Sequence, residues 1–302
     1  MTTTSTPVLE PSSGAAAPQA HATRPFLWSV RREIWEHPSV WAAPLIVAAV
    51  VLFGFIVGDR DLGRTHRVFM GLDPANQAMM LSAVYAGFAA ALVATGAIVG
   101  AFYCLAALGG ERRDRTILFW KSLPVSDVTA VAAKAAIPLV AIPAFVFVVI
   151  IALQILMLIS NSVLLLFLGY DPSILWTRLP FDDLTLMLAY GIITGTLWYA
   201  PVFGWLLLVS AWAKRASFLW AVGTPLALCL FERIAFGTGY LSRLLGERLS
   251  GDSGAFTVTV RHELPRLDPA GFLANPGLWV GLALAVAFLV GAVALRRRQA
   301  PI

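Results

Sequence analysis

Charged residues are scarce in this chain. Only 13% of its 302 residues are Asp, Glu, Lys or Arg, while 59% are hydrophobic. An ordinary soluble domain carries about 25% charged residues. Uncharged runs long enough to cross a hydrocarbon core, which takes about 20 residues of helix, recur along the whole chain. The composition argues against a soluble domain with one anchor and predicts a single all-α membrane domain.

The residues that metal, nucleotide or covalent chemistry would need are sparse or badly spaced. The two cysteines lie in different apolar runs, the histidines are scattered, and no lysine follows a glycine as a phosphate loop requires. We therefore expect no catalytic residue, no metal site and no cofactor bound by this chain itself. No charged residue lies centrally in an apolar run, which counts against a carrier driven by protons or ions.

Six apolar runs are predicted to span the membrane. They extend from Val40 to Gly58, about Ala78 to Gly110, Ala135 towards Tyr170, Leu184 to Ala213, Ala216 to Phe231 and Pro269 to Leu295. We expect the third to be interrupted at Ser160–Asn161–Ser162, leaving one span and a short apolar segment outside it. The fifth is barely long enough to cross. Without it, however, Arg296–Arg298 would fall on the outer side, against the positive-inside rule, so both termini are expected inside.

The ends of the chain differ from the apolar runs in composition. Residues 1–23 are rich in Thr, Ser, Ala and Pro and lack the apolar core of a signal peptide. We interpret them as a disordered tail, residues 24–298 as the six-span domain, and residues 299–302 as a short C-terminal tail.

The segment RPFLWSVRREIWEHP precedes the first run. Helical spacing places four apolar residues on one side and the polar residues around the other: Phe26, Leu27, Val30 and Ile34 against Ser29, Arg31, Arg32, Glu33 and Glu36. Such a segment is predicted to lie flat in the inner interface as an amphipathic helix. The alternative is a plain extension of the first span, which Pro38 and Pro44 disfavour.

Glycines four residues apart occur in four of the runs, beginning at Gly54, Gly96, Gly191 and Gly277. Such pairs allow helices to approach closely. They predict tightly packed spans, and one of them could serve a subunit interface.

The densest cluster of charge, in GGERRDRTILFWKSLPVSD, lies between the second and third runs. Residues 111–115 would extend the second helix beyond the lipid headgroups, and Thr116 to Trp120 form an apolar patch. Pro124 favours a turn, after which Ser126 and Asp127 can cap the next helix. One interpretation is a compact cytosolic knob. The other is an interfacial anchor in which Phe119 and Trp120 insert and the basic residues meet lipid phosphates.

The string ERRDRTILFWKSLPVSDVTAVAAK resembles the corresponding loop of ABC-2 type permeases, the membrane subunits of many ATP-binding-cassette exporters. In that family ER-D-T-LFW-SLPVS is a recurring pattern. The layout from Arg24 to Arg298 is similar too, with a flat N-terminal helix, six spans, a coupling loop after span two and a long outer loop after span five.

The resemblance implies a coupling helix that sits on a separate ATP-binding subunit. Its residues would be Glu111, Arg112, Arg113, Asp114, Arg115, Ile117, Leu118, Phe119, Trp120, Lys121, Leu123 and Pro124, with charge contacts from the first residues and a hydrophobic plug from the apolar ones. The flat helix, through Arg31, Arg32, Glu33, Ile34 and Trp35, would brace the same subunit. Two permease chains, identical or related, would join two ATPase chains that bind ATP and Mg.

The expected function is export across a bacterial inner membrane of an amphipathic substrate that is lipid-like, peptide or drug-like. Trp198, Tyr199, Phe203 and Trp205 are candidate pathway-lining residues in the fourth span. Residues 232–268 would carry short helices that partly re-enter the membrane as an exit gate, with Glu232 and Arg233 at the end of the fifth helix. The alternatives are a non-transporting partner that transmits force from the same ATPase, and a secondary carrier or channel. No nucleic-acid partner is expected.

Overall fold

The computed structural model describes residues 25–58, 67–113, 126–251 and 267–298, and within them the regular structure is entirely helical. The elements are α1 (Pro25–Glu36), α2 (Ser39–Gly58), α4 (Pro74–Arg113), α6 (Asp127–Ala136), the π-helix η1 (Ile137–Ala141), α7 (Ile142–Phe167), α8 (Ser173–Arg178), α9 (Phe181–Trp212), α10 (Ser217–Phe236), α11 (Tyr240–Ser250), α12 (Pro269–Ala274) and α13 (Pro276–Arg298). In these residues six helical segments are long and apolar enough to cross a membrane: α2, α4, the continuous α6–η1–α7, α9, α10 and α13. The prediction of six apolar spans in an all-helical protein is confirmed to that extent.

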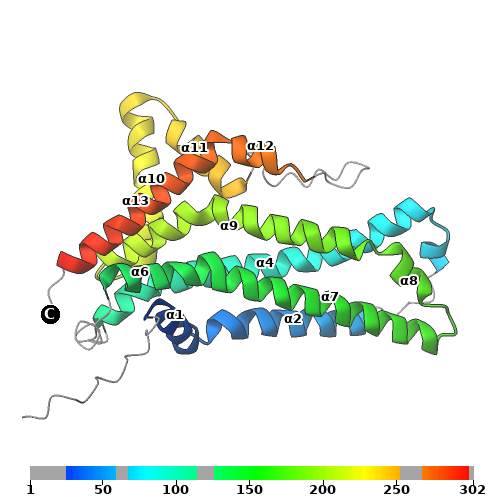
Figure 1. Ribbon diagram of the computed structural model, residues 1–302. Helices are drawn as coiled ribbons and strands as arrows, with labels where there is room; N and C mark the ends of the chain where they lie inside the picture. The colour runs from blue at the N-terminus through cyan, green and yellow to red at the C-terminus, as the bar shows by residue number, and fades with distance from the viewer. Residues whose placement is uncertain (1–24, 59–66, 114–125, 252–266, 299–302) are drawn as a thin grey trace, which may run out of the picture.

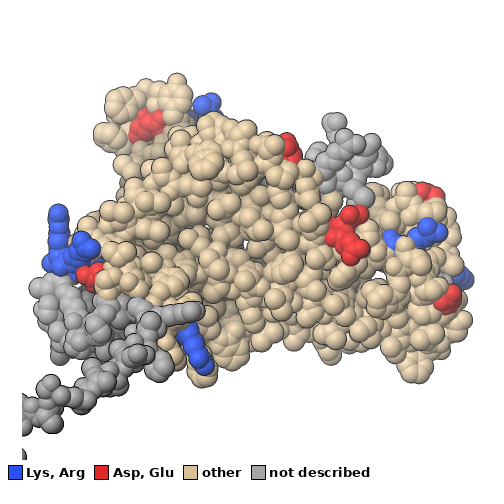
Figure 2. Space-filling view, in the orientation of Figure 1, with Lys and Arg blue, Asp and Glu red and all other residues tan. Residues whose placement is uncertain are grey.

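Four long helices, α2, α4, α7 and α9, lie side by side, and α13 packs along α9 (Figure 1). The buried centre includes Leu92, Cys104, Ile150 and Leu207, each at most 1% exposed. The outside of the bundle is apolar as well. Figure 2 shows a broad uncharged surface, on which most of the Lys, Arg, Asp and Glu residues lie nearer the two ends and one acidic cluster lies right of the centre. Lipid is the solvent in which such a surface is stable.

Both glycines of one predicted pair, Gly96 and Gly100, lie at close contacts within the chain. A Cβ atom on Gly96 would lie 2.8 Å from Val146 Cγ2, and one on Gly100 would lie 3.3 Å from the Phe203 ring. These glycines therefore let α4 approach α7 and α9 closely. By contrast, a Cβ atom on Gly54 would meet nothing within 4 Å.

The interruption expected at Ser160–Ser162 is wrong, because the third span is one continuous helical path from Asp127 to Phe167. The Ser160 and Ser162 hydroxyls donate to the carbonyl oxygens of Leu156 and Leu158, four residues earlier. Serine can remain in an apolar helix when its hydroxyl bonds to its own backbone in this way. The path changes to π geometry at η1, where Pro138 lies at the start of the wider turn.

The sixth run is not one helix, because α12 and α13 are separated at Asn275. Pro276 disfavours helical geometry in the residue before it, and Asn275 has extended backbone angles of φ −71° and ψ 114°. The Asn275 side chain then accepts a hydrogen bond from Gly277 N at 2.8 Å, which caps the start of α13.

The fifth span is longer than expected and continues to Phe236, so Glu232 and Arg233 lie inside α10 and do not end it. The helix stops at Gly237, which has the positive φ of +63° that glycine adopts readily. At its other end, Ala216 has φ +53°, and this is the turn after which α10 extends away from the bundle (Figure 1). Ala221 is the one buried residue of α10.

Candidate functional site

The charged loop that carries the family resemblance falls mostly outside the described residues. The structure gives the helical backbone of 111–113 and nothing of 114–125, so the arrangement of Glu111 to Pro124 stays a prediction. The elements on either side of it are described. α4 leads into the loop, and α6 follows it with Ser126 as N-cap, its Oγ accepting from Thr129 N at 3.1 Å.

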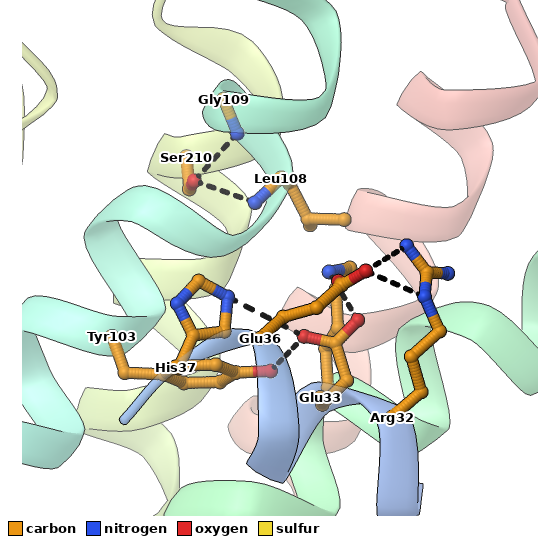
Figure 3. Close-up of polar contacts among 9 residues, drawn as sticks. Arg32, Glu33, Glu36, His37, Tyr103, Leu108, Gly109 and Ser210 are labelled. Atoms are coloured by element: carbon orange, nitrogen blue, oxygen red, sulfur yellow. Dashed lines mark hydrogen bonds and ion pairs between the residues drawn. The ribbon is translucent and has the colours of Figure 1, made fainter. Parts of the chain in front are cut away.

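A buried ion pair joins α6 to α1. Lys134 Nζ lies 2.8 Å from Glu33 Oε1, and both side chains are at most 6% exposed. Tyr103 on α4 donates its hydroxyl to the other carboxylate oxygen, Glu33 Oε2, at 2.7 Å (Figure 3). His37 Nε2 lies 3.7 Å from the same oxygen. One carboxylate therefore connects three helices near the charged loop.

The pKa of Glu33 reflects two opposing effects. Burial alone raises the pKa of this carboxyl group, because the charged form loses its hydration. The charge and hydrogen bond of Lys134, the Tyr103 hydrogen bond and the charge of His37 together outweigh burial, so the net pKa lies below the ordinary value of 4.5. Glu33 is therefore ionised at neutral pH.

Glu33 does not lie where helical spacing predicts. The spacing places Arg31, Arg32 and Glu33 together on the polar side of α1. In the structure Glu33 is 5% exposed and faces the bundle, on the same side as Val30 and Ile34. A distant lysine makes this possible, because a buried carboxylate is tolerated only with a partner. The apolar face of α1 therefore has a charge in its centre.

A second ion pair joins α6 to α13. Arg296 Nε lies 3.1 Å from Asp127 Oδ1, with the arginine side chain 8% exposed. Asp127 is the first residue of α6 after the loop. The helix that leaves the loop is therefore held by ion pairs at both Asp127 and Lys134.

The helix that enters the loop is held by Ser210 of α9. Its Oγ accepts from Leu108 N at 3.1 Å and Gly109 N at 3.0 Å (Figure 3). The same hydroxyl donates to Leu105 O at 2.9 Å. Leu105 O and Gly109 N are partners in the ordinary i→i−4 pattern of a helix, so the hydroxyl enters the backbone ladder of α4. A Cβ atom on Gly109 would lie 3.4 Å from Ser210 O, which shows how closely the two helices approach there.

The four aromatic residues proposed as pathway liners separate into two pairs. Tyr199 and Phe203 line a cavity of about 110 Å³ between α4, η1, α7 and α9. Trp205 instead donates to Ala221 O of α10 at 3.0 Å and lies against the Phe288 ring. Trp198 is 3% exposed and packs on Phe272 and Leu278.

Arg248 of α11 holds a second set of contacts on α9. Its guanidinium carbon lies 4.0 Å from the centre of the Trp198 ring, and its Nη1 donates to Gly277 O at 3.0 Å. Trp198 and Tyr199 in turn donate to the carbonyl oxygens of Arg248 and Leu249, each at 3.1 Å. α11 is therefore attached to both α9 and α13.

Glu232 fixes the other end of α11. Its carboxylate accepts from Thr238 Oγ1, Tyr240 N and Leu241 N, each at 2.8 Å. It thus satisfies amide groups at the first turn of α11. Sequence reasoning assigned Glu232 to a helix end and gave Arg248 no role, because both contacts depend on how distant segments fold back.

No family model, curated protein or solved structure matches this chain. The described residues also contain no group of three or more His, Cys, Asp or Glu side chains that could hold a metal ion. The site must therefore be interpreted from its own contacts.

Proposed function

We propose that this chain is the membrane subunit of an ATP-driven transporter of the ABC-2 type, which moves an amphipathic substrate. A separate ATPase subunit would supply ATP hydrolysis, with its ATP and Mg, and the chain itself would not be an enzyme. Two such chains, identical or related, would assemble with two ATPase subunits in a bacterial inner membrane. The six apolar spans and the ERRDRTILFWKSLPVS string support this proposal.

One observation carries the mechanical part of the proposal. Both helices that flank the charged loop are fastened to other helices by buried or half-buried polar contacts, α4 through Ser210 and α6 through Lys134 and Asp127. A displacement of the loop would therefore move α1, α9 and α13 together with α4 and α6. A transporter needs such a rigid connection, because nucleotide binding must favour one of two arrangements of the spans.

The ATPase-partner test uses the tagged chain, purified from its native membrane in mild detergent. Mass spectrometry of the bound proteins should find a subunit with a phosphate loop, and Leu123→Asp should remove it, because a charge in the hydrophobic plug opposes docking. Leu168→Asp is the matched control. Leu168 is exposed at the C-terminal end of α7, whereas the charged loop precedes the N-terminal end of the α6–η1–α7 span. The Leu168→Asp variant should therefore still bind the ATPase subunit.

Three outcomes separate the alternatives. Recovery of the chain alone, with conductance or transport in liposomes that lack ATP, would contradict the proposal and favour a carrier or channel. Recovery of the ATPase without ATP-dependent movement of an amphipathic dye would favour a force-transmitting partner. Equal loss of the subunit in both variants would mean that the loop is not the docking site.

A further inference from the structure

The exposed face of α1 carries two tryptophans and an arginine. Trp28 and Trp35 are 63% and 75% exposed, and Arg31 is exposed between them. The Arg31 guanidinium carbon lies 5.7 Å from the centre of the Trp28 ring and 6.0 Å from that of Trp35. The three residues are spaced at i, i+3 and i+7, so they follow one stripe of the helix, opposite the buried Glu33.

Arg31 is the uncompensated charge of this stripe. Glu33 is paired with Lys134, and Glu36 with Arg32, whose Nε lies 2.6 Å from Glu36 Oε1. Arg31 makes no ion pair with any side chain that the structure describes. The stripe therefore presents one net positive charge between two indole rings.

The place of α1 favours a lipid as the occupant. Only two residues separate α1 from the apolar span α2, so α1 lies at the level where the bilayer meets water. α1 is also at the periphery of the bundle, beside α6 and the start of α2 (Figure 1). Indole rings are stable at the headgroup level, and a guanidinium binds phosphate oxygens through two parallel hydrogen bonds.

We propose that Trp28, Arg31 and Trp35 form a binding site for the headgroup of an anionic phospholipid of the bilayer. The indole rings of Trp28 and Trp35 orient the Arg31 guanidinium towards the lipid phosphate, and they contact the parts of the acyl chains next to the headgroup. The uncompensated charge selects headgroups with net negative charge over zwitterionic ones. This proposal replaces the contact with the ATPase subunit that the resemblance implies for Arg31 and Trp35, and it does not depend on the proposed transport function.

The lipid-preference test places the full-length chain, without an ATPase, in nanodiscs of phosphatidylcholine with a minor share of phosphatidylglycerol. Native mass spectrometry after transfer to detergent measures which lipid stays bound. Arg31→Gln should reduce the preference for phosphatidylglycerol about fivefold, because one basic residue near an anionic surface contributes about that factor. Arg31→Lys should keep part of it, since the charge remains without the planar fork.

Arg32→Gln is the matched control, because it removes the same charge from the next residue, whose partner is Glu36. It should keep most of the preference. Equal losses in the two variants would overturn the proposal in favour of a diffuse attraction to net charge, and an unchanged Arg31→Gln would overturn it outright. If Arg31→Gln released the ATPase subunit from the native complex while lipid binding stayed normal, the stripe would be a protein interface. Thermal unfolding of each variant confirms that it is folded.

Discussion

Two regions of the bundle hold their helices together by different chemistry. At α6, ion pairs between ionised side chains, Glu33 with Lys134 and Asp127 with Arg296, join this helix to α1 and α13. At Trp198 and Tyr199, the attachment to α11 uses indole and phenol donors, backbone carbonyl oxygens and the Arg248 guanidinium over the Trp198 ring, and it contains no ion pair. The first region depends on charge pairing that fails if one partner is lost. The second depends mainly on shape and on groups that do not titrate near neutral pH.

The largest effect is expected from Lys134→Met, which leaves Glu33 as a buried carboxylate without its main partner. Removing one member of a buried pair typically costs about 3–5 kcal/mol. Unfolding of the purified variant in detergent, followed by intrinsic fluorescence, measures this loss. The double variant Glu33→Gln/Lys134→Met should recover much of it, because neither charge is then buried alone.

The matched control for the ion pair is Arg243→Met in α11. Arg243 pairs with Glu247 at 3.7 Å, but its side chain is 69% exposed, so its removal should change stability by at most about 1 kcal/mol. If Lys134→Met were as mild as Arg243→Met, the buried pair would not hold α1 to α6.

A smaller effect is expected from Gly281→Ala at the α11 attachment. An added Cβ atom would coincide with the Arg248 guanidinium, which is the flexible end of its side chain and would move away. The bond to Gly277 O and the stacking on Trp198 would then be lost, about 2 kcal/mol together. Thermal unfolding of the purified variant tests this.

Two further variants test whether displacement of the Arg248 guanidinium causes the loss of stability in Gly281→Ala. Gly223→Ala in α10 should have almost no cost, because a Cβ atom there would meet nothing within 4 Å. In an Arg248→Ala background, Gly281→Ala should also have little effect, since the obstructing group is gone. Additive losses in the double variant would exclude the guanidinium as the reason.

The smallest expected effect is a change of stability with pH, which should occur for the Glu33 ion pair and not for the attachment of α11. The pKa of Glu33 is lower in the folded protein than its ordinary value of 4.5, so its contribution to stability is fully present above that value. It is lost as the pH falls through the folded-state pKa. The difference in unfolding temperature between wild type and Glu33→Gln should therefore shrink as the pH falls below 4.5, whereas that between wild type and Gly281→Ala should stay constant. Parallel pH curves for all three proteins would contradict this assignment.

The spans could be predicted from the sequence because their signal is local. A run such as Val40 to Gly58 needs only length and lack of charge to be recognised, and α2 follows it closely. The polarity of Ser160–Ser162 wrongly predicts an interruption, because the Ser160 and Ser162 hydroxyls bond to carbonyl oxygens of their own helix and the span continues through them. Asn275 was missed because the run around it is apolar and only the following proline signals a break.

The polar connections could not be predicted, because they join residues far apart in sequence. Glu33 and Lys134 are 101 positions apart, and Ser210 and Gly109 are also 101 apart. Helical periodicity assigns Glu33 to the solvent side unless a partner for it is known. The same periodicity correctly separates Arg31 from Val30 and Ile34, since no distant residue alters that part of the helix.

The left-handed backbone of Ala216 has a consequence for how α10 enters the membrane. For a residue with a Cβ atom this conformation costs about 1–2 kcal/mol, so the backbone of the turn between α9 and α10 is strained. α10 buries only Ala221 against the bundle, and its far end is tied through Glu232 to α11. The direction of the fifth span is therefore set at its two ends, and its exposed apolar sides are left to contact lipid or another chain.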